Sequence, residues 1–327
     1  MSGSALLEIQ GLRVVFATEH GVARAVDGVD LALRAGETLG LVGESGSGKT
    51  LTALSVLRLV EPPGRIESGR ILFRGRDLLS LGERELRGIR GNEIGMVFQE
   101  PLSALDPVLR IEDQVGEALS AHRDLARASV RERVRELLAL ARLPDPAACA
   151  RSYPHQLSGG MRQRVLIAIA MACDPALVLA DEPTSSLDVT VQAEILALLR
   201  ELRRARGTSF LLITHDLGVV AEMADRVAVM YAGRIVELAD AAELFERPAH
   251  PYTAGLLASR PGLARPAERL RAIPGAVPSA TDYPSGCRFR TRCPIARPAC
   301  AESEPALVPV AAGATHLAAC PFAGELP

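Results

Sequence analysis

Lysine occurs only once in this chain of 327 residues, tryptophan does not occur, and aromatic residues make up 3%. The hydrophobic fraction is 48%, so aliphatic side chains must fill most of a core that a chain of this length can make large. The 37 basic and 39 acidic residues leave a net charge of −2, which argues against a surface dedicated to nucleic acid. Since every other basic residue is arginine, the position of the single lysine needs an explanation.

Long apolar runs are also missing. The best run, residues 165–173, has nine residues, whereas a membrane-spanning helix needs about 18 or more. The N-terminus lacks the basic and then apolar order of a secretory signal peptide. We therefore expect a cytosolic chain, in which any role at a membrane depends on partner subunits.

The single lysine lies in Gly43-Glu44-Ser45-Gly46-Ser47-Gly48-Lys49-Thr50, which fits the phosphate-binding pattern G-x-x-x-x-G-K-[ST] at every position. Residues 37–42 predict a short buried strand before this loop, and leucines at helical spacing predict a helix after it. In that context the backbone N–H groups and the helix N-terminus face anionic phosphates. We expect the loop to bind a nucleoside triphosphate; a chance glycine-rich turn is the alternative.

Predicted strands alternate with predicted helices along the middle of the chain. Strands are expected at 94–98, 176–180 and 210–214, helical segments at 108–150 and 192–206, and a hairpin at 227–236. This order is typical of an α/β fold with a mainly parallel sheet and helices on both faces. Ligands of such sheets gather at the carboxyl ends of the strands. The polar residues expected at those ends are Lys49, Gln99, Asp181, Glu182 and His215.

Two adjacent carboxylates, Asp181 and Glu182, follow one of these apolar strands. Such an aspartate can hold Mg²⁺ through water while Thr50 ligates the ion directly. Glu182 is then free to orient or deprotonate the water that attacks the γ-phosphate. The amide of Gln99 can reach both the ion and that water. Alternatives are a surface acidic pair and, for His215, a purely structural histidine.

A second helix start that favours anions occurs at residues 157–161, where Ser158, Gly159 and Gly160 precede an apolar run. One loop of the chain is already expected to hold the phosphates. We therefore expect the second anion-favouring helix start to close over the nucleotide of a partner subunit. On these motifs residues 6–240 resemble the ATP-binding-cassette (ABC) ATPases. The resemblance identifies the Walker A loop at 43–50, the Q-loop at Gln99, the signature at 157–161, Walker B at 176–182 with catalytic Glu182, the D-loop at 185–188 and the switch histidine at His215.

The resemblance implies that two subunits enclose two ATP molecules head to tail, with each signature capping the γ-phosphate held by the other. It also implies a nucleotide-binding domain at 1–240 with a helical subdomain at about 100–170. These ATPases usually stack adenine on an aromatic residue shortly before Walker A. Phe16 is the nearest candidate, although a gapless comparison places Thr18 there.

Two further segments resemble importers for peptides and nickel. Residues 98–107 are similar to the segment after their Q-loop, with Asp106 where asparagine is usual, and residues 248–257 are similar to their tail. Such importers pair two different ATPases, and the resemblance favours the first of them for this chain. It implies a location at the cytoplasmic face of the cell membrane. It implies a homologous ATPase partner, two transmembrane permeases and an extracytoplasmic substrate-binding protein. Di- or oligopeptides are the first expected cargo and nickel the second.

A soluble ABC ATPase acting on nucleic acid is the rival hypothesis from a different class. Such proteins typically carry two cassettes or a long coiled-coil insertion. This chain has one cassette, no long heptad run and a slightly acidic net charge, so we expect no nucleic-acid partner.

Cysteine and proline concentrate in the last part of the chain. Of the 22 prolines, 13 lie after residue 240, which predicts an extension at 241–327. In a cytosolic chain, clustered cysteines more often bind metal than form disulfides. Thiolates suit zinc or an iron–sulfur cluster, and the loose Cys-x5-Cys-x6-Cys-x19-Cys spacing leans away from zinc. The resemblance implies a [4Fe–4S] cluster, with zinc and free thiols as alternatives. Its ligands would be Cys287, Cys293, Cys300 and Cys320.

Overall fold

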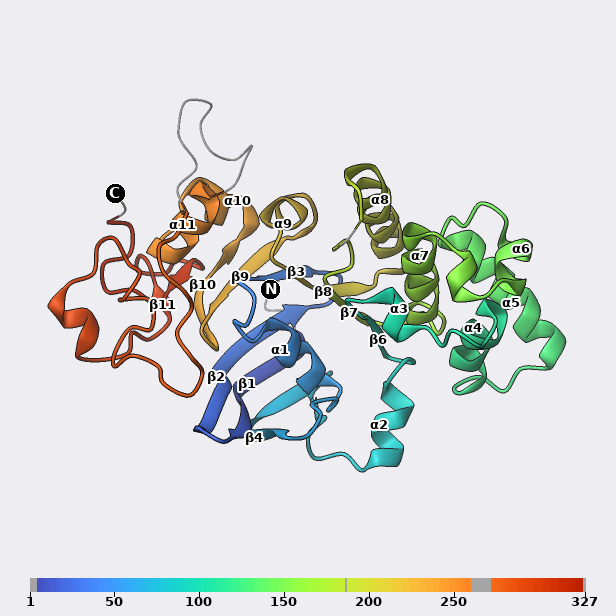
Figure 1. Cartoon of the computed structure of the whole chain (residues 1–327), viewed down its shortest axis with the longest axis horizontal. Helices are drawn as coiled ribbons and strands as arrows, with labels where there is room; N and C mark the ends of the chain where they lie inside the picture. Colours follow the sequence, from blue (N-terminus) through green and yellow to red (C-terminus); the bar gives the residue numbers. More distant parts are fainter. Residues whose placement is uncertain (1–4, 186, 260–271, 326–327) are drawn as a thin grey trace. The chain divides into compact units, whose positions relative to one another are not determined.

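The computed structural model describes residues 5–185, 187–259 and 272–325 (Figure 1). Contacts divide the described chain into two compact units. The helical unit comprises residues 34–37 and 80–213, apart from Ser186, which lies outside the described residues. The P-loop unit comprises the described parts of 4–33, 38–79 and 214–327, and so includes the C-terminal extension.

The P-loop unit contains two groups of strands. An antiparallel sheet has the order β2-β1-β4-β5, and consists of β1 (Ala5–Thr18), β2 (Gly21–Arg34), β4 (Gly64–Phe73) and β5 (Arg76–Asp77). The other strands run in the order β11-β12-β10-β9-β3, with β3 (Thr38–Val42), β9 (Arg226–Tyr231), β10 (Arg234–Asp240), β11 (Val308–Pro309) and β12 (Leu317–Ala318). Its helices are α1 (Lys49–Val56), α9 (Leu217–Met223), α10 (Ala241–Glu246), α11 (Pro251–Ala258) and the 3-10 helix η2 (Pro298–Ala301).

The expected strand–loop–helix order around the lysine is confirmed. Strand β3 is buried at all five positions and pairs in parallel with β9. The expected hairpin is also present, since β9 and β10 are antiparallel and turn at Ala232 and Gly233. Both turn residues have positive φ, as a two-residue hairpin turn with the sheet's twist requires.

Three of the few aromatic residues join the extension to this sheet. The ring of Tyr231, at the end of β9, lies 4.6 Å from that of Tyr252 and 5.2 Å from that of Phe289, between centroids. All three are buried within one apolar cluster with residues of β3 and β9. The extension therefore shares a hydrophobic core with the strands that flank the P-loop.

The helical unit contains the parallel strands β6 (Ile94–Val97), β7 (Leu177–Asp181) and β8 (Ser209–Thr214), in the order β8-β7-β6. Its helices, mostly green in Figure 1, are α2 (Glu83–Ile89), α3 (Pro101–Ala104), α4 (Ile111–Ser120), α5 (Arg127–Leu140), α6 (Pro146–Arg151), the 3-10 helix η1 (Pro154–Gln156), α7 (Gly159–Ala170) and α8 (Val189–Arg206). The three expected parallel strands are thereby confirmed.

Some local features differ from the sequence-based expectation. Helix α8 begins at Val189 rather than at Gln192, because the Asp188 carboxylate accepts a hydrogen bond from Val191 N–H and caps the helix. The sequence pattern does not predict the strands β1 and β2 or the short helix α2. No helix in the described residues is both long and apolar enough to cross a lipid bilayer.

Candidate functional site

The P-loop packs so closely on neighbouring backbone that two of its glycines have no room for a side chain. A Cβ on Gly43 would lie 2.1 Å from the carbonyl oxygen of Met230, and one on Gly48 would lie 2.5 Å from that of Ala25. Both glycines also have positive φ, and Gly48 is the N-cap of α1. The loop thus passes from β3 to the start of α1 in the geometry that favours anions.

The ammonium group of Lys49 is enclosed by this loop. Its Nζ donates to the carbonyls of Gly43 and Glu44, each over 2.8 Å, and to Ser47 Oγ over 3.3 Å. The residue is only 6% exposed. A compact ammonium can serve three convergent acceptors, whereas a planar guanidinium is larger and has fixed donor directions. This explains why lysine is retained here in a chain that otherwise uses arginine.

The helical unit brings Gln99 and Glu182 together, although they lie 83 residues apart in sequence. Gln99 Nε2 donates to Glu182 Oε2 over 3.3 Å. Asp181 ends β7 and is buried, and Glu182 follows it with a φ of +46°. Its backbone N–H donates to the carbonyl of Ile213 over 2.8 Å, which fixes this unusual conformation. Non-glycine residues held at positive φ cluster at functional sites.

The signature segment forms an exposed helix start within the same unit. Ser158 is the N-cap of α7, and its Oγ accepts a hydrogen bond from Met161 N–H over 3.3 Å. Ser158 and Gly159 are exposed and Gly160 is partly buried. The anion-favouring end of this helix is therefore exposed at its first two residues.

His215 and Phe16 belong to the P-loop unit. His215 is exposed between β8 and α9, and the neighbouring Asp216 caps α9 by accepting from Gly218 N–H over 2.8 Å. Phe16 is half-buried on β1, where it pairs with Gly64 of β4. Thr18 Oγ1 donates to the carbonyl of Gly21 over 2.7 Å. The adenine-stacking role of Phe16 stays a prediction.

The four cysteines of the extension line one small cavity of about 10 Å³, together with aromatic rings that include Phe289. Burial raises the pKa of Cys320 to about 11 and also raises the pKa values of Cys287 and Cys293, so these thiols are protonated at neutral pH. All the cysteines are free thiols. In the part of the chain that the structure describes, no group of three or more His, Cys, Asp or Glu side chains is arranged to hold a metal ion.

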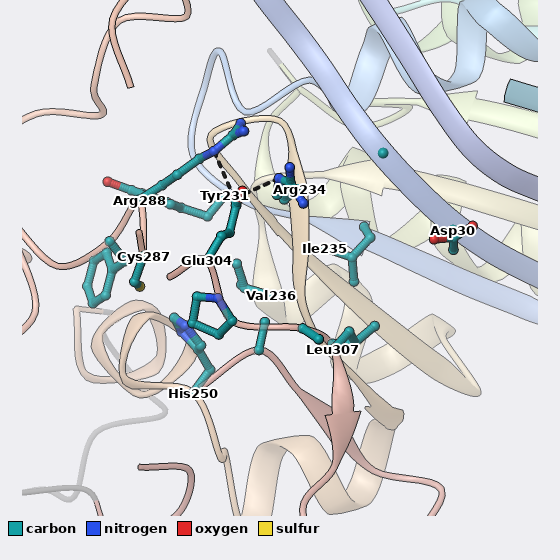
Figure 2. Close-up of a pocket in the computed structure, with 15 residues that line it drawn as sticks. Asp30, Tyr231, Arg234, Ile235, Val236, His250, Cys287, Arg288, Glu304 and Leu307 are labelled. Carbon is teal, nitrogen blue, oxygen red and sulfur yellow. Dashed lines mark ion pairs between the residues drawn. The ribbon is translucent and has the colours of Figure 1, made fainter. Parts of the chain in front are cut away.

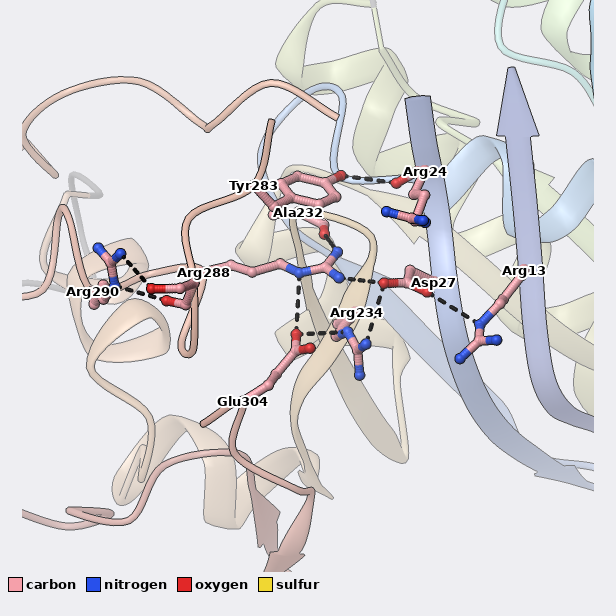
Figure 3. Close-up of polar contacts among 10 residues, drawn as sticks. Arg13, Arg24, Asp27, Ala232, Arg234, Tyr283, Arg288, Arg290 and Glu304 are labelled. Carbon is pink, nitrogen blue, oxygen red and sulfur yellow. Dashed lines mark hydrogen bonds and ion pairs between the residues drawn. The ribbon is translucent and has the colours of Figure 1, made fainter. Parts of the chain in front are cut away.

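A network of ion pairs joins the extension to β2 and to the β9–β10 hairpin (Figure 3). Arg288 donates to the carboxylate of Asp27 and to the carbonyl of Ala232, and also pairs with Glu304. Arg234 pairs with the same two carboxylates, at 3.2 and 2.7 Å. Burial by itself raises the pKa of Asp27, but the hydrogen bonds and charges of the two arginines outweigh it and lower the pKa. The extension is thus fixed to the rest of the P-loop unit by an ion-pair network around the buried pair of Arg288 and Asp27.

Beside this network lies a cavity of about 350 Å³ whose lining includes Arg234, Arg288, Glu304, His250 and Cys287 (Figure 2). The two arginines are committed to Asp27 and Glu304. His250 is fully buried, and burial lowers its pKa to about 4, so it is neutral at neutral pH. The positive charges at the cavity are thus neutralised by carboxylates of the same ion-pair network, and we assign the cavity no ligand.

The fold resembles the dimeric ATP-binding cassette MJ0796 in a post-hydrolysis state bound to ADP and Pi, with a TM-score of 0.66 and 28% identity, over 72% of this chain and 98% of that one. Residues 26–185 match the family described as ABC transporter, and residues 236–300 match the oligopeptide/dipeptide transporter C-terminal region. Fold and motifs together define an ABC cassette, an ATPase whose hydrolysis of ATP drives transport.

Two relatives resemble nearly the whole chain. A probable peptide ABC transporter ATP-binding protein of Sinorhizobium fredii is 49% identical over 96% of this chain and 94% of its own length. The dipeptide transport ATP-binding protein of Bacillus subtilis is 48% identical over 88% of this chain and 87% of its own. The chain belongs to the ATP-binding proteins of the peptide and oligopeptide import family of ABC transporters.

Proposed function

We propose that this chain hydrolyses ATP to power the import of di- or oligopeptides. The observation that carries this proposal is the match of residues 236–300 to the C-terminal region of oligopeptide and dipeptide transporters. As a member of this importer family, the chain would act through two transmembrane permeases, at the cytoplasmic face of the membrane. A homologous second ATPase and an extracytoplasmic substrate-binding protein complete the proposed assembly.

Within the P-loop unit we assign residues 43–50 to the phosphates of ATP. The backbone N–H groups of the loop and the Lys49 ammonium stabilise negative charge there, and Thr50 supplies a hydroxyl ligand for Mg²⁺. His215 is assigned as the switch residue and Phe16 as the adenine contact. The nucleotide-binding domain is proposed to end near residue 240, where the extension starts.

Within the helical unit we assign Glu182 as the base that accepts a proton from the attacking water. The hydrogen bond from Gln99 holds its carboxylate, and Asp181 beside it offers the oxygen donors that Mg²⁺ prefers. Bound Mg²⁺ would neutralise charge on the phosphates as the γ-phosphoryl group departs. Ser158, Gly159 and Gly160 are proposed to contact the nucleotide of the partner ATPase.

Transport of peptides can be tested in cells that lack the gene for this chain. We expect uptake of a radiolabelled dipeptide to be lost and to return with the wild-type chain but not with the Glu182→Gln variant. Uptake of nickel, measured in parallel, is expected to stay normal. Loss of nickel uptake with normal peptide uptake would contradict the proposed cargo.

We also propose that the four clustered cysteines hold a [4Fe–4S] cluster. They span residues 287–320 yet line the same cavity, and once deprotonated the four cysteines would form a suitable donor set. The present cavity of about 10 Å³ is smaller than a cluster, so the cysteine side chains have to separate to bind one. A cluster would hold together a proline-rich segment that has little regular structure of its own.

The cluster proposal predicts about four iron and four acid-labile sulfide atoms per chain after anaerobic purification. Cys300→Ser is expected to lower both contents by more than half, because it removes one ligand. Cys149→Ala is the matched control, since Cys149 is a buried thiol on α6, outside the cysteine cluster. Stoichiometric zinc, or neither metal, would show that the proposal is wrong.

A further inference from the structure

Glu44, the first variable residue of the P-loop, is held by two residues of the C-terminal extension. Its carboxylate accepts two hydrogen bonds from Arg292, over 2.6 Å from Nη1 and 2.9 Å from Nη2. Its backbone N–H donates to Tyr252 Oη over 2.8 Å. The side chains of Arg292 and Tyr252 are buried. The carboxylate and the backbone N–H of Glu44 are therefore both bound by residues that lie more than 200 positions later in the sequence.

The two residues that hold Glu44 are themselves fixed. Arg292 Nε donates to the carbonyl of Pro274 over 2.9 Å, and its Nη1 lies 3.4 Å from Tyr231 Oη. A bidentate pair between arginine and a carboxylate is strong and geometrically specific. The ring of Tyr252 is packed between other aromatic rings in the core cluster described above. Neither contact can shift without disturbing that core.

Glu44 also accepts a hydrogen bond from the lysine of the P-loop. Its carbonyl accepts from Lys49 Nζ over 2.8 Å and from Ser47 N–H over 3.2 Å. The side chain, N–H and carbonyl of Glu44 are thus all occupied, and this orders a loop whose glycines allow many conformations. A loop that is ordered in advance binds its ligand more tightly, because less conformational entropy is lost on binding.

We propose that Arg292 and Tyr252 are positioning residues for ATP, which hold the P-loop through Glu44 in the conformation that receives the phosphates. Arg292 immediately precedes Cys293, one of the four cysteines that share a cavity. One of the two residues that hold Glu44 therefore belongs to the cysteine-rich segment of the extension. This inference rests on the proposed assignment of residues 43–50 to the phosphates.

The test is calorimetric titration of the full-length chain with ATP. Arg292→Ala is expected to weaken binding about tenfold, the order of effect of losing one hydrogen-bonded charge pair. In ATPase assays the KM for ATP rises while kcat stays within about twofold, because Arg292 acts through Glu44. Arg297→Ala is the matched control: this arginine pairs with Glu325 and stacks on Phe322 in the same extension. Its affinity for ATP is expected to be that of the wild type.

A double-mutant cycle separates positioning from a general loss of structure. Glu44→Ala also weakens binding, and adding Arg292→Ala to it has no further effect, because the two side chains act as a pair. Additive effects, or unchanged affinity of Arg292→Ala, would overturn the proposal. If Arg292→Ala unfolds the extension, Tyr252→Phe keeps the ring and removes only the acceptor for Glu44 N–H. Severalfold weaker binding is then expected, and wild-type affinity would overturn the proposal.

The same titration identifies a failure of the underlying assignment. Lys49→Ala is expected to abolish measurable ATP binding. If that variant binds like the wild type, the assignment of the P-loop to phosphate is wrong. If only the Arg292 and Tyr252 variants bind like the wild type, the loop assignment stands and the positioning role is wrong.

Discussion

Replacing Glu182 with glutamine is expected to lower ATP turnover by about 10²- to 10³-fold while leaving ATP binding intact. The substitution preserves side-chain size, so the contact with Gln99 and the backbone hydrogen bond to Ile213 can persist. It removes the only property that the proposed mechanism requires, a carboxylate that takes a proton from water. Turnover falls because the chemical step fails, while the KM for ATP changes little.

A consequence of this substitution is that bound ATP persists. If the cassette closes with its partner around ATP and opens after hydrolysis, the variant is expected to accumulate as a nucleotide-bound dimer. Size-exclusion chromatography with both ATPase subunits and ATP measures this directly. Glu132→Gln, at an exposed position on α5, is the matched control and is expected to hydrolyse ATP normally. Turnover of Glu182→Gln close to that of the wild type would exclude Glu182 as the base.

The parts of the site that follow directly on strands could be predicted from sequence. The P-loop is specified by contiguous residues, so its strand, loop and helix were recognisable together. The contact between Gln99 and Glu182 follows from topology, because β6 and β7 are parallel neighbours and their carboxyl ends lie at the same edge. The parallel pairing of β6 with β7 is therefore enough to place Gln99 close to Glu182.

The contacts of the extension with the P-loop could not be predicted in this way. Tyr252 lies in a short segment that resembles other importers, but nothing in its spacing shows that its hydroxyl reaches Glu44. Arg292 is one of several arginines near the cysteines, and only the folded chain distinguishes it from Arg290, which donates to Ser285 instead. Such contacts depend on tertiary packing of a loop-rich segment, which leaves no periodic signal in the sequence.

The start of helix α8 is likewise not visible in the apolar periodicity. The predicted start at Gln192 relied on apolar periodicity, whereas the true start at Val189 is set by the capping carboxylate of Asp188. Val189 is 83% exposed, so it adds nothing to the apolar stripe that the periodicity detects. Caps are local hydrogen bonds and do not require a buried residue at the first helical position.

Replacing Lys49 with arginine is expected to lower ATPase activity by about 10²-fold or more, even though the positive charge is kept. Lys49 is 6% exposed, and its ammonium has three hydrogen-bond acceptors within 3.3 Å, all of them in the P-loop itself. A guanidinium is bulkier and planar, so it cannot direct donors at Gly43, Glu44 and Ser47 from the same position. Either the P-loop is displaced or the guanidinium lies outside it, and both outcomes impair stabilisation of the phosphates.

Steady-state ATPase assays on Lys49→Arg, Lys49→Ala and the wild type measure this effect. The two Lys49 variants are expected to be similarly inactive, because the shape of the cation matters as much as its charge. Arg131→Lys, on the exposed face of α5, is the control for exchange of one basic residue for the other. Substantial activity of Lys49→Arg would mean that charge alone suffices at this position. The retention of a single lysine in an arginine-rich chain would then have no explanation in the geometry of the loop. Loss of activity in both variants, with normal thermal stability, would instead tie that lone lysine to the phosphates of ATP.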